Sequence, residues 1–92
     1  MQFEWDENKR RSNHTKHGVD FIDAVKSFAD PQRIEGYDES HSNEEDRWWT
    51  IAKTPGKHTT LFVIYTERVG GLIRLVSARK ASKHECEAYN KG

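Results

Sequence analysis

The sequence predicts an α+β fold in which an antiparallel β-sheet meander packs with two N-terminal helices and a short C-terminal helix. Two segments in the first third of the chain carry helix-capping residues, at 6–18 and 20–30. Three apolar segments follow, at 47–53, 59–67 and 72–79, and short turns separate them. Strands joined by short turns pair in antiparallel with their neighbours, so these segments indicate a meander.

The first helical segment has the ends of a helix but no apolar face. Asp6 is a suitable N-cap, and Gly18 suits the left-handed conformation that follows a helix C-terminus. Between Glu7 and His17 there is no aliphatic or aromatic side chain. A helix that is polar all round is not held in place by burial, which leaves two interpretations. Either it presents a functional surface, which we favour, or it is a solvated helix held by its caps, with Asn13 or His17 bonding nearby backbone.

The second helical segment is amphipathic. Asp20 is a good N-cap, and the Asp30-Pro31 pair ends the helix. Its apolar residues recur at helical spacing, namely Phe21, Ala24, Val25 and Phe28. This face predicts packing against the sheet.

The strands differ in their expected burial. Residues 2–5 and the stretch around Ile34 are short strand candidates, and a polar loop occupies 38–46. The segment 59–67 is apolar on both faces, which indicates a central strand. Simple alternation along 72–79 groups Leu72, Arg74, Val76 and Ala78 on one face and Ile73, Leu75, Ser77 and Arg79 on the other, unless a bulge intervenes. Ser82 and Glu85 form a capping box for the last helix, which we expect to end near Tyr89.

Composition indicates a single domain over residues 1–92. Cys86 is the only cysteine, so no intrachain disulfide forms, which suits a reducing compartment. The N-terminus lacks the apolar stretch of a signal peptide, and the longest apolar run, at 61–65, is too short to span a bilayer. We therefore expect a cytoplasmic protein without membrane contact.

Charge is unevenly distributed although the formal net charge is zero. Residues 35–46 contain six acidic and no basic side chains, whereas 47–83 contain eight basic side chains and one acidic one. Basic charge on a sheet favours phosphate binding. The alternative is that these side chains are solvated faces that balance the acidic loop.

Arg74 and the histidines allow more than one interpretation. Arg74 lies inside an apolar strand and needs a partner, for which Glu67 across the hairpin is a candidate; a functional role is equally open. His14 and His17 share a helix face, but spacing supplies no third ligand, so no metal site is expected. His58 and His84 are possible acid–base groups without an identified partner.

An ordered set of segments resembles the BrnT toxin family of bacterial type II toxin–antitoxin systems, which are small RelE-like ribonucleases. The matching pieces are FEWDENK (3–9), Asn13 with KHGVDF (16–21), SFADP (27–31), EEDRWWTIAKTPGK (44–57), YTER (65–68), IRLVSARKAS (73–82), Glu85 and Tyr89. The sequence departs from the family pattern at Cys86, where an arginine is expected, and at Lys57-His58, where Gly-Arg is common. Both departures reduce the local positive charge.

The resemblance implies a RelE-like toxin that cleaves RNA, inhibits translation and arrests growth. It also implies a BrnA-like antitoxin with a ribbon-helix-helix part, through which alone the toxin would meet operator DNA. RNA cleavage without a metal ion requires one group to accept the 2′-hydroxyl proton, cations for the phosphorane and a proton for the leaving oxygen. No cofactor is expected.

The candidate site residues follow from the matching segments and from this chemistry. The expected catalytic residues are Glu67 as base and Arg68, Arg74, Arg79 and Lys80 as cations. The expected RNA-binding residues are Lys53, Lys57, His58 (also a weaker candidate acid) and Lys83. The expected partner-binding residues are Trp5, Lys9, Asn13, Lys16 and His17.

Two other functions compete with the ribonuclease. One is a non-catalytic relative that binds the antitoxin and takes part in operon autoregulation, which the missing arginine at Cys86 favours. The other is a free-standing nucleic-acid-binding domain, whose affinity would fall steeply with salt.

Overall fold

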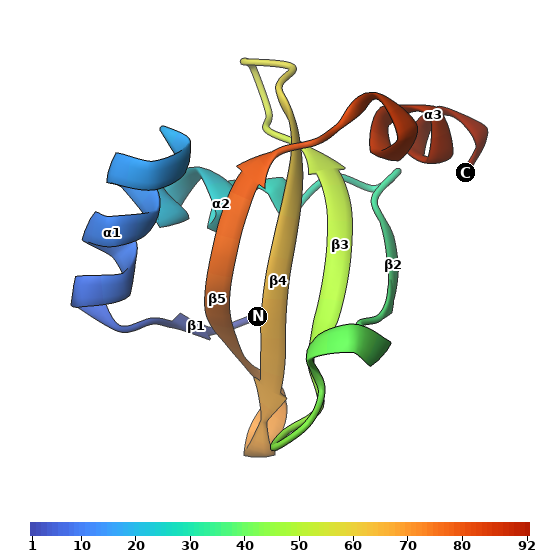
Figure 1. The fold of residues 1–92 in the computed structure, drawn as a ribbon. Coiled ribbons are helices and arrows are strands. Elements are labelled where there is room, and N and C mark those ends of the chain that lie inside the picture. Colours follow the sequence, from blue (N-terminus) through green and yellow to red (C-terminus); the bar gives the residue numbers. More distant parts are fainter.

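A computed structural model describes the backbone of residues 1–92 and the side chains of 1–40 and 42–92. The elements are, in chain order, β1 (Phe3–Glu4), α1 (Glu7–His17), α2 (Phe21–Ser27), β2 (Ile34–Tyr37), the 3-10 helix η1 (Glu39–His41), β3 (Trp48–Lys53), β4 (Thr60–Arg68), the 3-10 helix η2 (Val69–Gly71), β5 (Leu72–Lys80) and α3 (Lys83–Lys91). The expected α+β fold is confirmed (Figure 1). No helix in the described part of the chain is long and apolar enough to cross a membrane.

The sheet has five strands in the order β1-β5-β4-β3-β2. Strands β3 to β5 form the predicted antiparallel meander, with β4 as its middle strand, and β2, around Ile34, extends it by pairing with β3. The short strand β1 pairs in parallel with β5, through Phe3 opposite Ile73, so the sheet is mixed. This pairing brings the N-terminus to the hairpin end of β5.

The core lies between the sheet and α2. In Figure 1, α2 passes behind the sheet and α1 stands beside β5. The buried core residues are Val19, Phe21, Ala24 and Phe28 from the helical segment, with Leu61, Val63, Tyr65, Ile73, Leu75 and Ala78 from β4 and β5. The predicted apolar face of α2 is thus the face that is buried. Helix α3 contacts β3 instead, through the side chains that alternate with the core residues.

Helix α1 is held by one amide rather than by an apolar face. The Asn13 side chain is only 7% exposed. Its Nδ2 donates to the carbonyl of Ala78 at 2.8 Å and to that of Val19 at 3.0 Å, while its Oδ1 accepts from the backbone N–H of Ala78 at 3.0 Å. The side chain therefore pairs with β5 as a neighbouring strand would. The expected bond from Asn13 to nearby backbone is therefore confirmed, whereas the functional surface favoured for this helix stays a prediction.

Both ends of α1 and the start of α3 are capped as the sequence predicts, whereas α2 ends at Ser27, before the predicted Asp30-Pro31, and α3 continues to Lys91, beyond Tyr89. The Asp6 carboxylate accepts from the backbone N–H groups at 8 and 9, and Gly18 has φ 70°. The Ser82–Glu85 capping box is present at the start of α3. These contacts satisfy backbone groups that the helix ends leave unpaired.

A β-bulge in β5 changes which residues share a face. Ile64 lies opposite Ser77 and Tyr65 opposite Leu75, so Val76 is the extra residue. Ser77 and Arg79 consequently share a face with Arg74, away from the core that holds Leu75. The simple alternation expected along 72–79 is therefore wrong beyond Leu75, because the bulge reverses its phase.

Candidate functional site

A groove of about 330 Å³ lies on the face of the sheet that turns away from the core. Strands β4 and β5 supply its floor, and the segment around η1 and the end of α1 supply its walls. Its lining residues are His17, Asp38, Ser40, Phe62, Ile64, Ser77 and Arg79. The bulge in β5 is what brings Ser77 and Arg79 to this face.

Arg79 is held over an aromatic ring at one end of the groove. Its guanidinium carbon lies 4.3 Å from the centre of the Phe62 ring, a cation–π contact. Phe62 also stacks on Trp49, with 6.2 Å between the ring centres and 18° between the planes. Trp49 in turn covers Gly36, where a Cβ atom would collide with its indole. Four neighbouring strands thus hold Arg79 and its ring support in place.

Arg79 is also bound to helix α3. Its Nη1 and Nη2 donate to the two carboxylate oxygens of Glu85 at 2.7 and 2.8 Å. The hydrogen bonds raise the pKa of Arg79 and lower the pKa of Glu85. This bidentate geometry is the one in which a guanidinium also binds a phosphate.

A second hollow, of about 240 Å³, continues the groove along the edge of β5. It is lined by Lys9, Ser12, Asn13, Lys16, His17, Val76 and Ser77. His17 and Ser77 line both hollows, so the two form one surface. Lys9 and Lys16 are exposed and add positive charge beside it. Of the residues expected to bind a partner, Lys9 and Lys16 therefore line the second hollow, and His17 lines both the groove and that hollow.

The expected catalytic residues do not form one cluster. Arg68 lies at the η2 end of the sheet and pairs with Glu45 at 3.5 Å. Arg74 pairs with Glu4 at 3.0 Å, because β1 lies beside β5 there. The expected Arg74–Glu67 pair is wrong, since Glu67 lies opposite Ile73.

At the other end of the sheet, Arg79 belongs to the groove but its neighbour Lys80 does not. Lys80 lines a separate hollow of about 150 Å³ together with Lys57 and Asp23. The ammonium of Lys57 lies 3.4 Å from the Asp23 carboxylate. Arg79 is thus the member of the expected cation set that lines the groove.

The other expected RNA-binding residues lie around helix α3 and the turn before β4. The ammonium of Lys53 lies 5.4 Å from the centre of the Tyr89 ring. His58 sits in the turn with φ 55°, and Lys83 is exposed at the start of α3. None of these residues lines the groove itself.

Two of the expected partner-binding residues have structural contacts. Trp5 packs edge-on against Phe21, with ring centres 6.3 Å apart, and its indole N–H donates to Glu7 at 3.1 Å. The amide of Asn13 is buried and bonded within the chain, so it is not available on a partner surface. Asn13 therefore has a structural role in this fold, and its expected contact with a partner stays a prediction.

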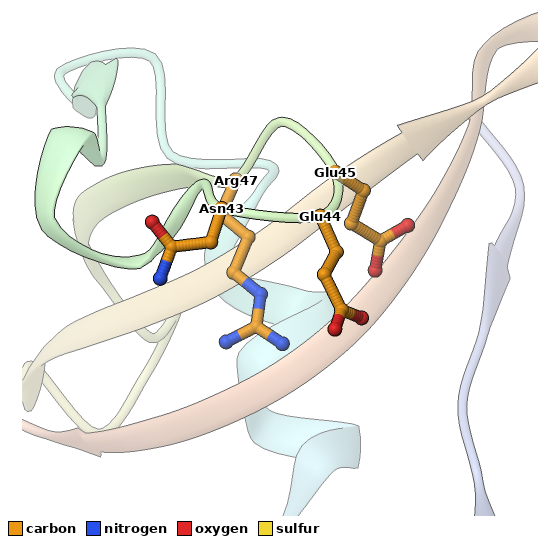
Figure 2. Close-up of a pocket in the computed structure, with 4 residues that line it drawn as sticks. All are labelled: Asn43, Glu44, Glu45 and Arg47. Atoms are coloured by element: carbon orange, nitrogen blue, oxygen red, sulfur yellow. The ribbon is translucent and has the colours of Figure 1, made fainter.

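A larger hollow, of about 520 Å³, lies at the acidic loop and is lined by Asn43, Glu44, Glu45 and Arg47. Figure 2 shows the side chains of Asn43, Arg47 and Glu44 pointing to the same side of this loop. Two carboxylates at its rim repel an anionic ligand. Despite its size, this hollow is a poor site for RNA.

Sequence reasoning missed Phe62 and Ser77. Phe62 belongs to the strand that is apolar on both faces, which hinted at a second apolar surface. No sequence pattern pointed to Ser77 as a groove residue, because the face on which it lies depends on the bulge. In the described part of the chain, no three His, Cys, Asp or Glu side chains are grouped to hold a metal ion.

Comparison with known proteins adds two findings. A family model described as "Ribonuclease toxin, BrnT, of type II toxin-antitoxin system" matches residues 5–85. The crystal structure of the Brucella abortus ribonuclease toxin BrnT is similar, with a TM-score of 0.65 and 27% sequence identity, over 90% of this chain and 99% of that one. No curated protein matches the chain.

Proposed function

Because this chain belongs to the BrnT family of ribonuclease toxins from type II toxin–antitoxin systems, we propose that it cleaves RNA in the groove over β4 and β5. The observation that carries the proposal is Arg79, a cation held on an aromatic ring at the floor of that groove. Single-stranded RNA offers both groups that such a place binds, a phosphate for the guanidinium and a base for stacking.

The proposed reaction needs no metal ion. The 2′ oxygen attacks the adjacent phosphorus, and Arg79 binds the oxygens on which negative charge accumulates. Lys9 and Lys16, at the rim of the adjoining hollow, attract the strand to the groove. In this proposal the expected cations Arg68, Arg74 and Lys80 contribute only to the positive electrostatic field around the RNA, because none of them lines the groove.

We further propose that cleavage inhibits translation and arrests growth. A BrnA-like antitoxin with a ribbon-helix-helix part neutralises the toxin and carries it to operator DNA. The basic surface formed by Lys9, Lys16 and the groove is suited to an acidic antitoxin segment, which would block the RNA path. The toxin acts in the cytoplasm, where both RNA and antitoxin are found.

One contact favours the non-catalytic alternative. Glu85 already occupies both outer nitrogens of Arg79 in the free protein. If Glu85 is never displaced, the chain binds an antitoxin without cutting RNA. The two functions are distinguished by a cleavage assay.

The first test compares the wild-type protein with Arg79→Gln on a labelled single-stranded RNA in the presence of a metal chelator. We expect the wild type to cleave and Arg79→Gln to lose about 100-fold or more in rate, because one transition-state cation is removed. Arg11→Gln is the matched control, since Arg11 is exposed on α1 and lines neither hollow. Thermal unfolding of each variant establishes that it is folded.

The outcomes separate the alternatives. No cleavage by a folded wild-type protein, together with no growth arrest on induction, would reject the ribonuclease and leave the antitoxin-binding module. Cleavage that stops on adding the chelator and returns with a divalent metal ion would reject the metal-independent mechanism. Equal activity in Arg79→Gln would place the site outside the groove.

A further inference from the structure

His17 stands where the two hollows beside β5 meet. It is half-buried at the end of α1 and lines both hollows together with Ser77. Arg79 lies two residues further along the same strand and lines the same groove. An imidazole and a guanidinium therefore line the same groove on the sheet.

The position of His17 is fixed by Asn13. The Asn13 amide exchanges two hydrogen bonds with Ala78, the residue between Ser77 and Arg79. His17 is four residues after Asn13, on the same helix face and about 5–6 Å further along the helix. The backbone turns away immediately afterwards, because Gly18 has φ 70° and its N–H bonds to the carbonyl of His14. These bonds thus fix the position of helix α1 along β5 so that His17 lines the groove.

We propose that His17 is the catalytic residue that accepts the proton of the ribose 2′-hydroxyl. This inference rests on the proposed ribonuclease function and identifies the general base, which the proposed reaction above leaves unassigned. As the proton moves to the imidazole, the 2′ oxygen forms its bond to phosphorus, and the bond from phosphorus to the 5′ oxygen breaks. The 5′ oxygen takes a proton from water, and the imidazolium then releases its proton to solvent. The products are a 2′,3′-cyclic phosphate and a 5′-hydroxyl.

Histidine suits this step, because it is the side chain that ordinarily exchanges a proton near neutral pH. The expected base Glu67 is poorly placed for it. Glu67 pairs with Ile73, six residues along β5 from Arg79, which is about 20 Å in a strand. The charged groups that share the surface with His17 are Lys9 and Lys16 from α1, Arg79 from β5 and Asp38 from the segment before η1.

The test measures cleavage of a labelled RNA by His17→Gln across the pH range 5–9, with His14→Gln as the matched control. His14 is in the same turn of α1 but is exposed and lines neither hollow. We expect His17→Gln to lose about 100-fold or more in kcat with little change in KM, and to lose the acidic limb of the pH–rate profile. We expect His14→Gln to behave as the wild type does. A second variant, His17→Ala, should regain activity when imidazole is added.

Each other outcome overturns the proposal. If His17→Gln cleaves RNA at the wild-type rate with the wild-type pH profile, His17 is not the base, although the ribonuclease function stands. If only KM rises, or if imidazole fails to rescue a folded His17→Ala, His17 binds RNA or supports the fold instead. If the wild type itself does not cleave RNA, both the proposed function and this inference fall.

Discussion

At the scale of single residues, one buried amide replaces the apolar face that α1 lacks. Asn13 binds both backbone groups of Ala78 as well as the carbonyl of Val19. Each such hydrogen bond adds little to the free energy of unfolding, because the same groups bond to water in the unfolded chain. Removing one partner lowers the free energy of unfolding by more, since the other polar group is left buried without a hydrogen bond. This one polar residue therefore attaches helix α1 to β5.

Asn13→Ala should destabilise the protein by about 3 kcal/mol, because the buried N–H and carbonyl groups of Ala78 lose their partner. The measurement is urea unfolding followed by tryptophan fluorescence. Asn8→Ala, an exposed change on the same helix, is the control and should change stability by less than about 0.5 kcal/mol. A loss in Asn13→Ala as small as that of the control would contradict the role assigned to the amide.

Thr66→Val should have the opposite effect. The hydroxyl of Thr66 is buried and, among the residues that the structure describes, has no hydrogen-bond partner. Valine keeps the shape of the side chain and removes the unpaired polar atom, so we expect a gain of about 1 kcal/mol in the free energy of unfolding. A lower denaturation midpoint for Thr66→Val would mean that the hydroxyl is satisfied in solution.

At the scale of elements, helix α3 is attached to the sheet by polar side chains rather than by a core. Glu85 binds Arg79, and the hydroxyl of Tyr89 donates to Asp30 at 2.6 Å. Burial, followed by the hydrogen bond to Asp30, raises the pKa of Tyr89 to about 12. Helix α3 therefore holds Arg79, a residue of the groove, through Glu85, but no residue of α3 lines the groove itself.

If RNA binds at Arg79 as proposed, Glu85→Gln should strengthen that binding, because it removes the negative charge that pairs with Arg79 in the free protein. We expect the Kd for a short single-stranded RNA to fall about fivefold, equivalent to ~1 kcal/mol. Fluorescence anisotropy measures this change, and Glu87→Gln, an exposed position on the same helix, is the control. Equal affinities in the two variants would indicate that Arg79 does not meet phosphate.

At the scale of the whole molecule, three carboxylates connect its parts. Asp20 binds Arg10, which joins the start of α2 to α1, and this bond lowers the pKa of Asp20. Burial raises the pKa of Asp30, but hydrogen bonds from Tyr89 and from two backbone N–H groups outweigh it, so the net shift is downward. With Glu85, these groups tie all three helices to one another or to the sheet.

The protein should consequently lose stability in acid. A carboxyl whose pKa is lower in the folded protein than in the unfolded chain stabilises the fold above its unfolded pKa, and that contribution disappears as the pH falls through the folded value. We expect a constant urea midpoint between about pH 5 and pH 8 and a decline below about pH 4. Asp20→Asn should make the decline shallower, and an unchanged slope would mean that Asp20 keeps its ordinary pKa in the folded protein.

The sequence predicted the elements better than the site. Caps at Asp6, Gly18 and Ser82 are local signals, and the structure confirms each of them. The partner of Arg74 is Glu4, seventy residues away in the chain, and local reasoning pointed to Glu67 instead. The bulge at Val76 determines on which face of the sheet Arg79 lies, and no residue type in that strand predicts a bulge there. The candidate site therefore could not be predicted from local sequence patterns, because it depends on contacts between distant segments and on the strand register.

The edges of the sheet bear on how the protein behaves at high concentration. Exposed strand edges pair readily with other copies of a chain and lead to aggregation. Along β5, the two residues of β1 and then the Asn13 amide occupy the outer edge, so another strand would have to displace α1 to add there. The opposite edge, β2, is only four residues long. The polar helix that lacks an apolar face thereby also blocks the addition of another strand along the β5 edge of the sheet.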